Sequence, residues 1–149
     1  MILGIIPARG GSKRIPGKNI KSFLGKPIIS YSILAAQESG VFDKIIVSTD
    51  SKEIATIARD YGAEVPFMRP KELSGDFLGT HEVVGHALQW LEDFGDALDY
   101  ACCIYATAPM IQGSDLIKGY DLIKTEKWKA VIAATKYSYP LFRSFKKIT

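Results

Sequence analysis

Short apolar segments alternate with helix-like segments along most of this chain of 149 residues. The candidate strands are residues 2–6, 45–48, 100–105 and 130–134. Between them, apolar residues recur three and four positions apart, as they do on one face of a helix. Strands that alternate with helices predict an α/β fold, in which a mostly parallel sheet carries helices on both faces. Ligands of such sheets bind beyond the carboxyl ends of the strands.

Four helices are expected, over residues 27–39, over residues 50–62, from Thr80, and from Ser114 or Asp115. Asp50 and Glu53 are spaced as a capping box for the second helix, so we expect Asp50 to act mainly as a helix cap rather than as a metal ligand. Thr80 is equally suited to capping its helix and to binding a ligand. A loop over residues 65–79, rich in Pro, Gly and charge, is expected to reach the carboxyl edge of the sheet.

The first candidate strand leads directly into a basic, glycine-rich loop at residues 7–19. Residues 1–37 contain six Lys or Arg and no Asp or Glu, whereas the other 112 residues contain 13 basic and 16 acidic groups. Glycine lets the backbone approach a ligand closely, and cations bind phosphate oxygens. A solvated loop with two turns would explain Pro16, Gly17 and some of the lysines, but not the absence of acids. The loop therefore predicts a polyphosphate site.

Two common phosphate-binding loops are excluded. A Walker A loop ends in Gly-Lys-Ser/Thr, but here Asn19 follows Gly17 and Lys18, and no Gly-x-Gly-x-x-Gly fingerprint occurs. A nucleic-acid footprint is also not expected, because the basic residues gather in one loop instead of along a face.

Other features of the sequence indicate one cytoplasmic domain. The 47% hydrophobic content is enough for one core, and no apolar stretch is long enough to span a membrane. Cys102 and Cys103 are adjacent, so on a strand they face opposite ways, and we interpret them as ordinary small side chains. His81 and His86 are five residues apart, a spacing that does not pair them on a helix for metal binding.

The loop and several later segments resemble the acylneuraminate cytidylyltransferases, CMP-sugar synthetases that activate nine-carbon acidic sugars with CTP. The matching segments are residues 7–13, 18–19, 25–27, 47–50, 69–70, 73–74 and 106–109, with Pro16 and Asp76. The resemblance covers nearly the whole chain. It implies a three-layer, Rossmann-like nucleotidyltransferase fold, from which a C-terminal part of the family fold is expected to be missing here.

The segment after the strand at 100–105 points to a subgroup of this family. Sialic acid enzymes have Gln-x-Thr-Ser-Pro there, whereas this chain has Tyr105 in place of the glutamine and Thr107 two residues later. In this respect it is similar to the pseudaminic acid cytidylyltransferases. N-acetylneuraminate and legionaminate remain the alternative sugars.

The resemblance also assigns roles to single residues. It implies that Arg9 and Lys18 are catalytic and contact the CTP phosphates, that Asn19 and Arg69 recognise cytosine, and that Tyr105 and Thr107 face the sugar. The full set implied to bind nucleotide is Ala8, Arg9, Gly10, Gly11, Ser12, Lys18, Asn19, Arg69 and Thr80. The plain alternatives are that Asn19 caps a turn, Arg69 forms a surface ion pair and Tyr105 lies in the core. No general base is identified.

The resemblance further implies a divalent cation, Mg²⁺, and a homodimer. Full-length family members carry a later Asp-x-Asp-type metal site and a protruding dimerisation segment, whereas no Asp or Glu follows Glu126 here. The metal ligands are therefore expected outside this chain, which is expected to be inactive alone. Residues 1–136 are interpreted as the nucleotide-binding domain, and residues 137–149 as the start of a dimerisation and sugar-site segment. The alternative is a nucleotide-binding module without catalysis.

Overall fold

A computed structural model describes residues 1–75 and 78–136 of the chain. Asp76 and the segment at residues 137–149 lie outside the described residues. In chain order the elements are β1 (Ile2–Pro7), the 3-10 helix η1 (Lys18–Ile20), β2 (Ser22–Phe23), β3 (Lys26–Pro27), α1 (Ile28–Ser39), β4 (Lys44–Ser48), α2 (Lys52–Asp60), the 3-10 helix η2 (Lys71–Leu73), α3 (Thr80–Asp93), β5 (Tyr100–Cys103) and α4 (Gly113–Ile123).

The central sheet has the strand order β4-β1-β5, and both pairings of β1 are parallel. Ile5 of β1 is opposite Ile46 of β4 on one side and opposite Cys103 of β5 on the other. Single bridges from Glu64 and Met68 extend the outer side of β4. β2 and β3 form a separate antiparallel hairpin. The parallel sheet predicted from the alternating pattern is confirmed.

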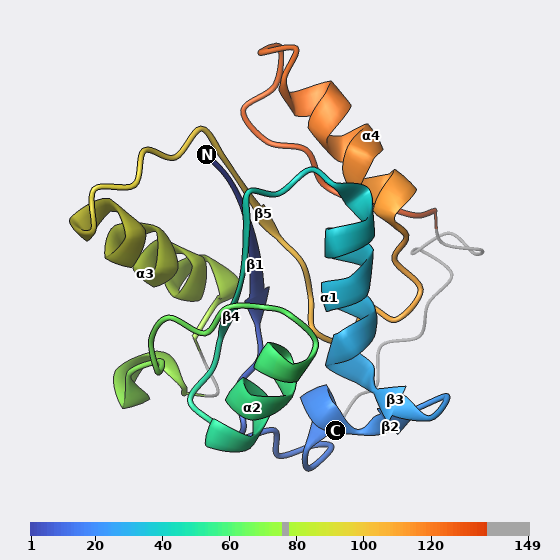
Figure 1. The fold of residues 1–149 in the computed structure, drawn as a ribbon, viewed down its shortest axis with the longest axis vertical. Coiled ribbons are helices and arrows are strands. Elements are labelled where there is room, and N and C mark those ends of the chain that lie inside the picture. The colour runs from blue at the N-terminus through green and yellow to red at the C-terminus, as the bar shows by residue number, and fades with distance from the viewer. Residues whose placement is uncertain (76–77, 137–149) are drawn as a thin grey trace, which may run out of the picture.

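The side chains of β1 divide the core into two clusters, one on each face of the sheet. Leu3 and Ile5 pack with Ala87 and Leu91 of α3, while Ile6 belongs to the cluster built by α1 and α2. This alternation follows from the strand geometry, in which successive side chains point to opposite faces. Figure 1 shows α3 on one side of the sheet and α1 with α4 on the other. The predicted three-layer arrangement is confirmed.

The predicted strand at residues 130–134 is wrong. These residues form an irregular segment after α4, and Ile132 is 85% exposed. An apolar run becomes a strand only where a neighbouring strand satisfies its backbone groups, and within the described residues β5 pairs with β1 alone.

The helices begin close to the expected positions, but their capping differs. Ser51, not Asp50, is the N-cap of α2, and its hydroxyl accepts from the Ile54 N–H. Gly79 is the N-cap of α3, so Thr80 is the first helical residue and does not cap it. The predicted capping role is therefore wrong for Asp50, and of the two roles left open for Thr80 the capping role is wrong. In α4, Gln112 caps the helix and Asp115 completes a capping box.

Helices α1 and α4 approach each other closely at Gly113. A Cβ added there would lie 3.0 Å from the Ser39 nitrogen and 3.3 Å from the Ala35 carbonyl oxygen, both backbone atoms of the α1 side. A backbone neighbour cannot move aside as a flexible side chain would. The absence of a side chain at Gly113 therefore sets the spacing of the two helices.

Gly113→Ala is expected to lower the free energy of unfolding by about 1–3 kcal/mol, because the added methyl group overpacks the α1–α4 contact. Gly119→Ala is the matched control in the same helix, since a Cβ there meets nothing within 4 Å. It should stabilise by about 0.5–1 kcal/mol through helix propensity. Urea unfolding of both variants measures the difference, and equal stabilities would contradict the close packing.

Candidate functional site

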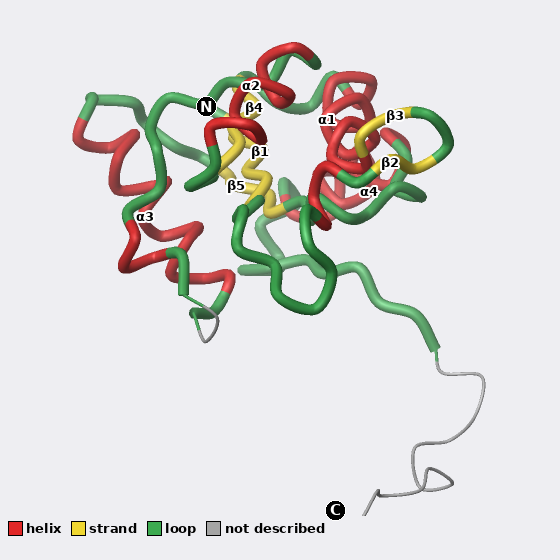
Figure 2. Tube along the Cα trace, turned by 90° about the horizontal axis from the view of Figure 1, so that it is seen from below, coloured by secondary structure: helices red, strands yellow, loops and turns green. Residues whose placement is uncertain are grey.

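The segments predicted to bind ligand meet at one edge of the sheet. The loop after β1, the segment after β4 and the segment after β5 all leave carboxyl ends of parallel strands, so they emerge on the same side. Figure 2 looks onto this side, where loops leave the ends of the central strands close to α2. The long loop at residues 65–79 reaches it too, because the Arg69 N–H donates to the Thr49 carbonyl at 2.7 Å.

Three hydrogen bonds fix the start of the basic loop. The Ala8 N–H donates to the Ser48 carbonyl at 2.9 Å, and the Gly10 N–H donates to Oδ1 of Asp50 at 2.7 Å. Nδ2 of Asn19 donates to the Arg9 carbonyl at 2.9 Å. The loop is thereby held from β4 on one side and from η1 on the other.

Glycine is required at position 10 by close approach. A Cβ added to Gly10 would lie 2.9 Å from Cβ of Ser51, a distance that side chains do not adopt. At Gly17, φ is 62°, the left-handed region that favours glycine. Two of the loop glycines thus have structural reasons that do not depend on a ligand.

Two of the three predicted phosphate-lining amides donate within the protein. The Gly10 N–H is bound by Asp50, and the Ser12 N–H donates to the Gly10 carbonyl at 2.9 Å. Gly11 has open space around its Cα. In this conformation an anion would therefore meet the basic side chains and the Gly11 amide first. Lys13 and Lys18 are exposed, and η1, which carries Lys18, packs against α1 and α2.

Arg69 lies inside the edge of the sheet and is only 6% exposed. Its Nε donates to Oγ of Ser48 at 3.0 Å, and its guanidinium also donates to the Ser48 carbonyl. Burial lowers the pKa of Arg69; the nearby Asp50 carboxylate raises that pKa, and Arg9 lowers it. The interpretation of Arg69 as part of a surface ion pair is therefore wrong.

Asn19 is also 6% exposed, and its amide has a structural partner in the Arg9 carbonyl. This bond uses Nδ2, so it does not engage the acceptor oxygen Oδ1 of the amide. Asn19 thus combines holding the loop with the capacity to recognise a hydrogen-bond donor. The prediction that it reads a nucleobase is compatible with this geometry.

Tyr105 follows β5 and is 61% exposed, so the alternative that it lies in the core is wrong. The Ser32 hydroxyl of α1 donates to the Tyr105 carbonyl at 2.8 Å, which fixes the backbone of this segment. The Tyr105 hydroxyl lies 3.4 Å from Oγ1 of Thr80 at the start of α3. Two predicted ligand-binding side chains from distant segments are therefore neighbours. Thr107 is half-buried two residues further along.

No cluster of three or more His, Cys, Asp or Glu side chains suitable for a metal ion occurs within residues 1–75 and 78–136. The Oδ1 atom of Asp50 already accepts from the Gly10 N–H. The described residues therefore do not form a metal centre by themselves.

Burial raises the pKa of the Cys102 thiol, so it stays protonated at neutral pH. Among the described residues no helix is both long and apolar enough to cross a bilayer.

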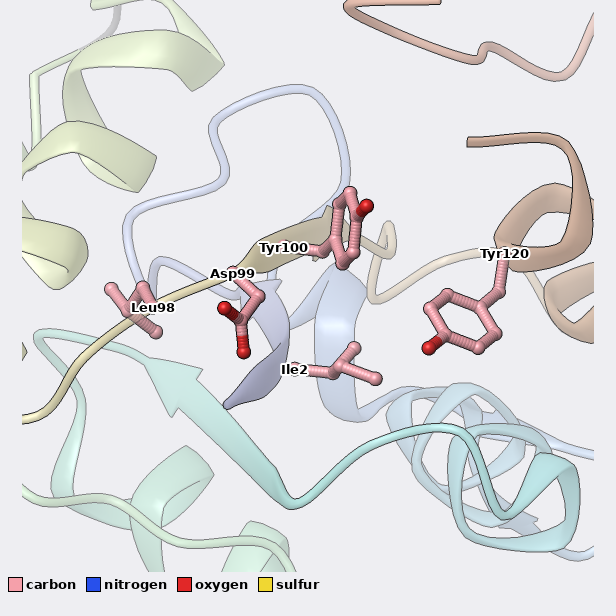
Figure 3. A pocket seen from close by; sticks show the side chains of 5 residues that line it. All are labelled: Ile2, Leu98, Asp99, Tyr100 and Tyr120. Carbon is pink, nitrogen blue, oxygen red and sulfur yellow. The ribbon is translucent and has the colours of Figure 1, made fainter. Parts of the chain in front are cut away.

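A shallow hollow of about 540 Å³ lies at the opposite end of the sheet. Figure 3 shows Tyr100 from β5 and Tyr120 from α4 lining it, beside Ile2, Leu98 and Asp99. Ile2 and Tyr100 begin their strands, so this hollow is at the amino ends and away from the basic loop. It contains none of the predicted site residues.

Sequence reasoning did not identify the roles of Ser51 and Ser32, and it placed Ser48 only within the matching segment at residues 47–50, without a role of its own. The Ser48 carbonyl accepts from the Ala8 N–H and from the Arg69 guanidinium. The Ser51 side chain packs against Gly10, and the Ser32 hydroxyl donates to the Tyr105 carbonyl. One signal was available for Ser32, which is a polar residue within the buried face of α1.

Comparison with known proteins identifies the family to which this chain belongs. The family model for cytidylyltransferases matches residues 3–138. The pseudaminic acid cytidylyltransferase of Campylobacter jejuni subsp. jejuni serotype O:2 is 48% identical over 143 residues, which are 96% of this chain and 62% of that protein. The CMP-N,N'-diacetyllegionaminic acid synthase of Legionella pneumophila is 47% identical over 93 residues, 62% of this chain and 39% of that protein.

A solved structure of CMP:2-keto-3-deoxy-manno-octonic acid synthetase, complexed with CTP, has the same fold. Its TM-score is 0.70 at 21% identity, over 84% of this chain and 48% of that one. The chain spans 62% of the length of two Campylobacter jejuni pseudaminic acid cytidylyltransferases that it matches. The predicted resemblance and the nucleotidyltransferase fold are both confirmed, and the chain belongs to the cytidylyltransferase family.

Proposed function

We propose that this chain is the nucleotide-binding part of a CTP-dependent cytidylyltransferase that activates a nine-carbon acidic sugar of the pseudaminic type. The observation that carries the proposal is the 48% identity, over 96% of the chain, with a pseudaminic acid cytidylyltransferase. The basic loop at the carboxyl end of β1 supports it, because a triphosphate needs several cations close together.

In this proposal the loop binds the triphosphate. Arg9 and Lys18 contact the phosphate oxygens, while the segment from Ala8 through Gly10 and Gly11 to Ser12 lines them. Asn19 and Arg69 recognise the cytosine, and Thr80 helps to hold the nucleotide. The bond from Asn19 to the Arg9 carbonyl supports this division, since it couples a base-reading side chain to a phosphate-binding one.

The reaction is attack by the anomeric hydroxyl oxygen of the sugar on the α-phosphorus of CTP. A bond forms between this sugar oxygen and the α-phosphorus, and the bond from the α-phosphorus to the oxygen that bridges to the β-phosphorus breaks. Pyrophosphate departs with that bridging oxygen, and the hydroxyl proton passes to solvent. The main barrier is electrostatic, because an acidic sugar approaches a triphosphate and charge builds on the leaving oxygens. Cations placed there in advance lower that barrier.

Tyr105 and Thr107 are proposed to face the sugar. Tyr105 is exposed and its hydroxyl lies beside Thr80, so the segment after β5 borders the proposed nucleotide site at this point. A tyrosine offers an aromatic face and a hydroxyl where a glutamine would offer an amide, which favours a sugar other than N-acetylneuraminate.

A divalent cation, Mg²⁺, and a homodimer remain part of the proposal. The described residues contain no group of three metal-ligating side chains, so no step is assigned here to a metal. Residues 1–136 are proposed as the nucleotide-binding domain and residues 137–149 as the beginning of a dimerisation and sugar-site segment. A cytoplasmic location is proposed for the enzyme.

The test of the function is calorimetric titration of the chain with CTP, followed by a pyrophosphate-release assay with a panel of nonulosonic acids and Mg²⁺. CTP binding is expected to be tighter than UTP or ATP binding. The 149 residues alone are expected to release no pyrophosphate, whereas the complete protein turns over pseudaminic acid. Binding without turnover by the complete protein would favour the nucleotide-binding module instead. Pyrophosphate release by the 149 residues would contradict their inactivity.

Arg9→Ala and Lys18→Ala are each expected to weaken CTP binding by about tenfold or more, because each removes a charged partner of the phosphates. In the complete protein, pyrophosphate release should fall by about 100-fold or more. Lys118→Ala is the matched control, since it removes an exposed cation from α4. Circular dichroism should show an intact fold for all three. Near wild-type rates in Arg9→Ala or Lys18→Ala would contradict the phosphate assignment.

Asn19→Ala is expected to lower the preference for CTP over UTP by about fivefold, through loss of one hydrogen bond to the base. The amide oxygen of Asn19 can accept from the amino group of cytosine, whereas uracil has a carbonyl there. The ratio of the two dissociation constants is the measurement, because a loosened loop would weaken both nucleotides equally. An unchanged ratio would show that Asn19 supports the loop without reading the base.

A further inference from the structure

Asp50 occupies an unexpected position between the basic loop and the end of β4. Its Oδ1 accepts from the Gly10 N–H at 2.7 Å, a bond that joins residues 40 positions apart. The residue after it, Ser51, supplies the cap of α2, so the carboxylate is not needed by the helix. The Asp50 side chain therefore belongs to the loop rather than to α2.

The surroundings of Asp50 are cationic. Arg69 is buried beside it and hydrogen-bonded to Ser48, and the Asp50 carboxylate acts on the Arg69 guanidinium in the direction that keeps it charged. Arg9 acts on Arg69 in the opposite direction, so the two arginines repel one another. The Asp50 carboxylate thus offsets the charge of the buried Arg69 and also holds the backbone at Gly10, the residue directly after Arg9.

The simple electrostatic expectation for such a carboxylate is unfavourable to CTP. A negative charge near a triphosphate repels it, and removal of that charge alone would tighten binding. A carboxylate at this position is useful only if the order that it gives the loop outweighs the repulsion.

From this geometry we infer that Asp50 is a positioning residue for the triphosphate site, which holds the basic loop in its binding conformation through the Gly10 N–H and the charge of Arg69. The inference rests on the proposed CTP-binding function. It assigns no contact between Asp50 and the substrates. Because Asp50 accepts the Gly10 amide, phosphate oxygens are left to the basic side chains and to the amide of Gly11.

The inference predicts an order of affinities among Asp50 variants. Asp50→Ala removes the acceptor and the charge, and CTP binding should weaken by at least about threefold. Asp50→Asn keeps an oxygen that can accept from Gly10 but no longer offsets the charge of the buried Arg69, so only part of the loop's support is lost and its affinity should lie between those of wild type and Asp50→Ala. Asp60→Asn, the same change at the exposed end of α2, is the control and should bind as wild type.

Calorimetry with CTP and nuclear magnetic resonance of the Gly10 amide provide the two measurements. The Gly10 resonance should shift in Asp50→Ala, and in wild type it should keep its hydrogen-bonded position as CTP is added. Tighter CTP binding by Asp50→Ala, or loss of the hydrogen-bonded Gly10 signal on CTP addition to wild type, would overturn the inference, since either would make Asp50 a competitor of phosphate.

Thermal unfolding separates positioning from simple destabilisation. The affinities are compared at a temperature at which every variant is fully folded, and an Asp50→Ala affinity equal to that of wild type would also overturn the inference. Failure of the wild-type chain to bind CTP would contradict the proposed function instead. In that case the Gly10 resonance in Asp50→Ala still reports whether the carboxylate holds the loop.

Discussion

The parallel pairing of β1 with β4 is the contact on which the rest of the site depends. Its register places Pro7 opposite Ser48, so that the Ser48 carbonyl is available to the Ala8 N–H just beyond the paired residues. The same carbonyl accepts from the buried Arg69. One backbone oxygen thereby fixes both the start of the basic loop at Ala8 and the position of Arg69 in the loop at residues 65–79. A shift of this register would displace both.

The layered fold could be predicted from the sequence because its determinants are local. Ile29, Ile33 and Ala36 recur at helical spacing and are all buried. The segment at residues 130–134 shows the limit of such reasoning. An apolar run carries the composition of a strand, but the neighbour that would pair with it is a property of the tertiary structure.

The site was predicted less completely, and Asp50 shows why. Asp50 and Ser51 are adjacent and both can cap a helix, so the sequence does not distinguish them. Only the position of Gly10, 40 residues earlier, assigns the carboxylate to the loop and the hydroxyl to α2. The burial of Arg69 was equally hidden, since it depends on a carbonyl 21 residues away. The location of the basic loop itself followed from the order of strand, glycines and cations.

The outer edge of β5 has a consequence for work with this chain. Within the described residues β5 pairs only with β1, and Ala101 and Cys103 are exposed. An unpaired strand edge presents backbone donors and acceptors that another extended segment can match. This edge is therefore a place where two copies of the chain could pair their backbones. A dimer of this chain seen in solution therefore has to be assigned to a surface before it is taken as support for the proposed homodimer.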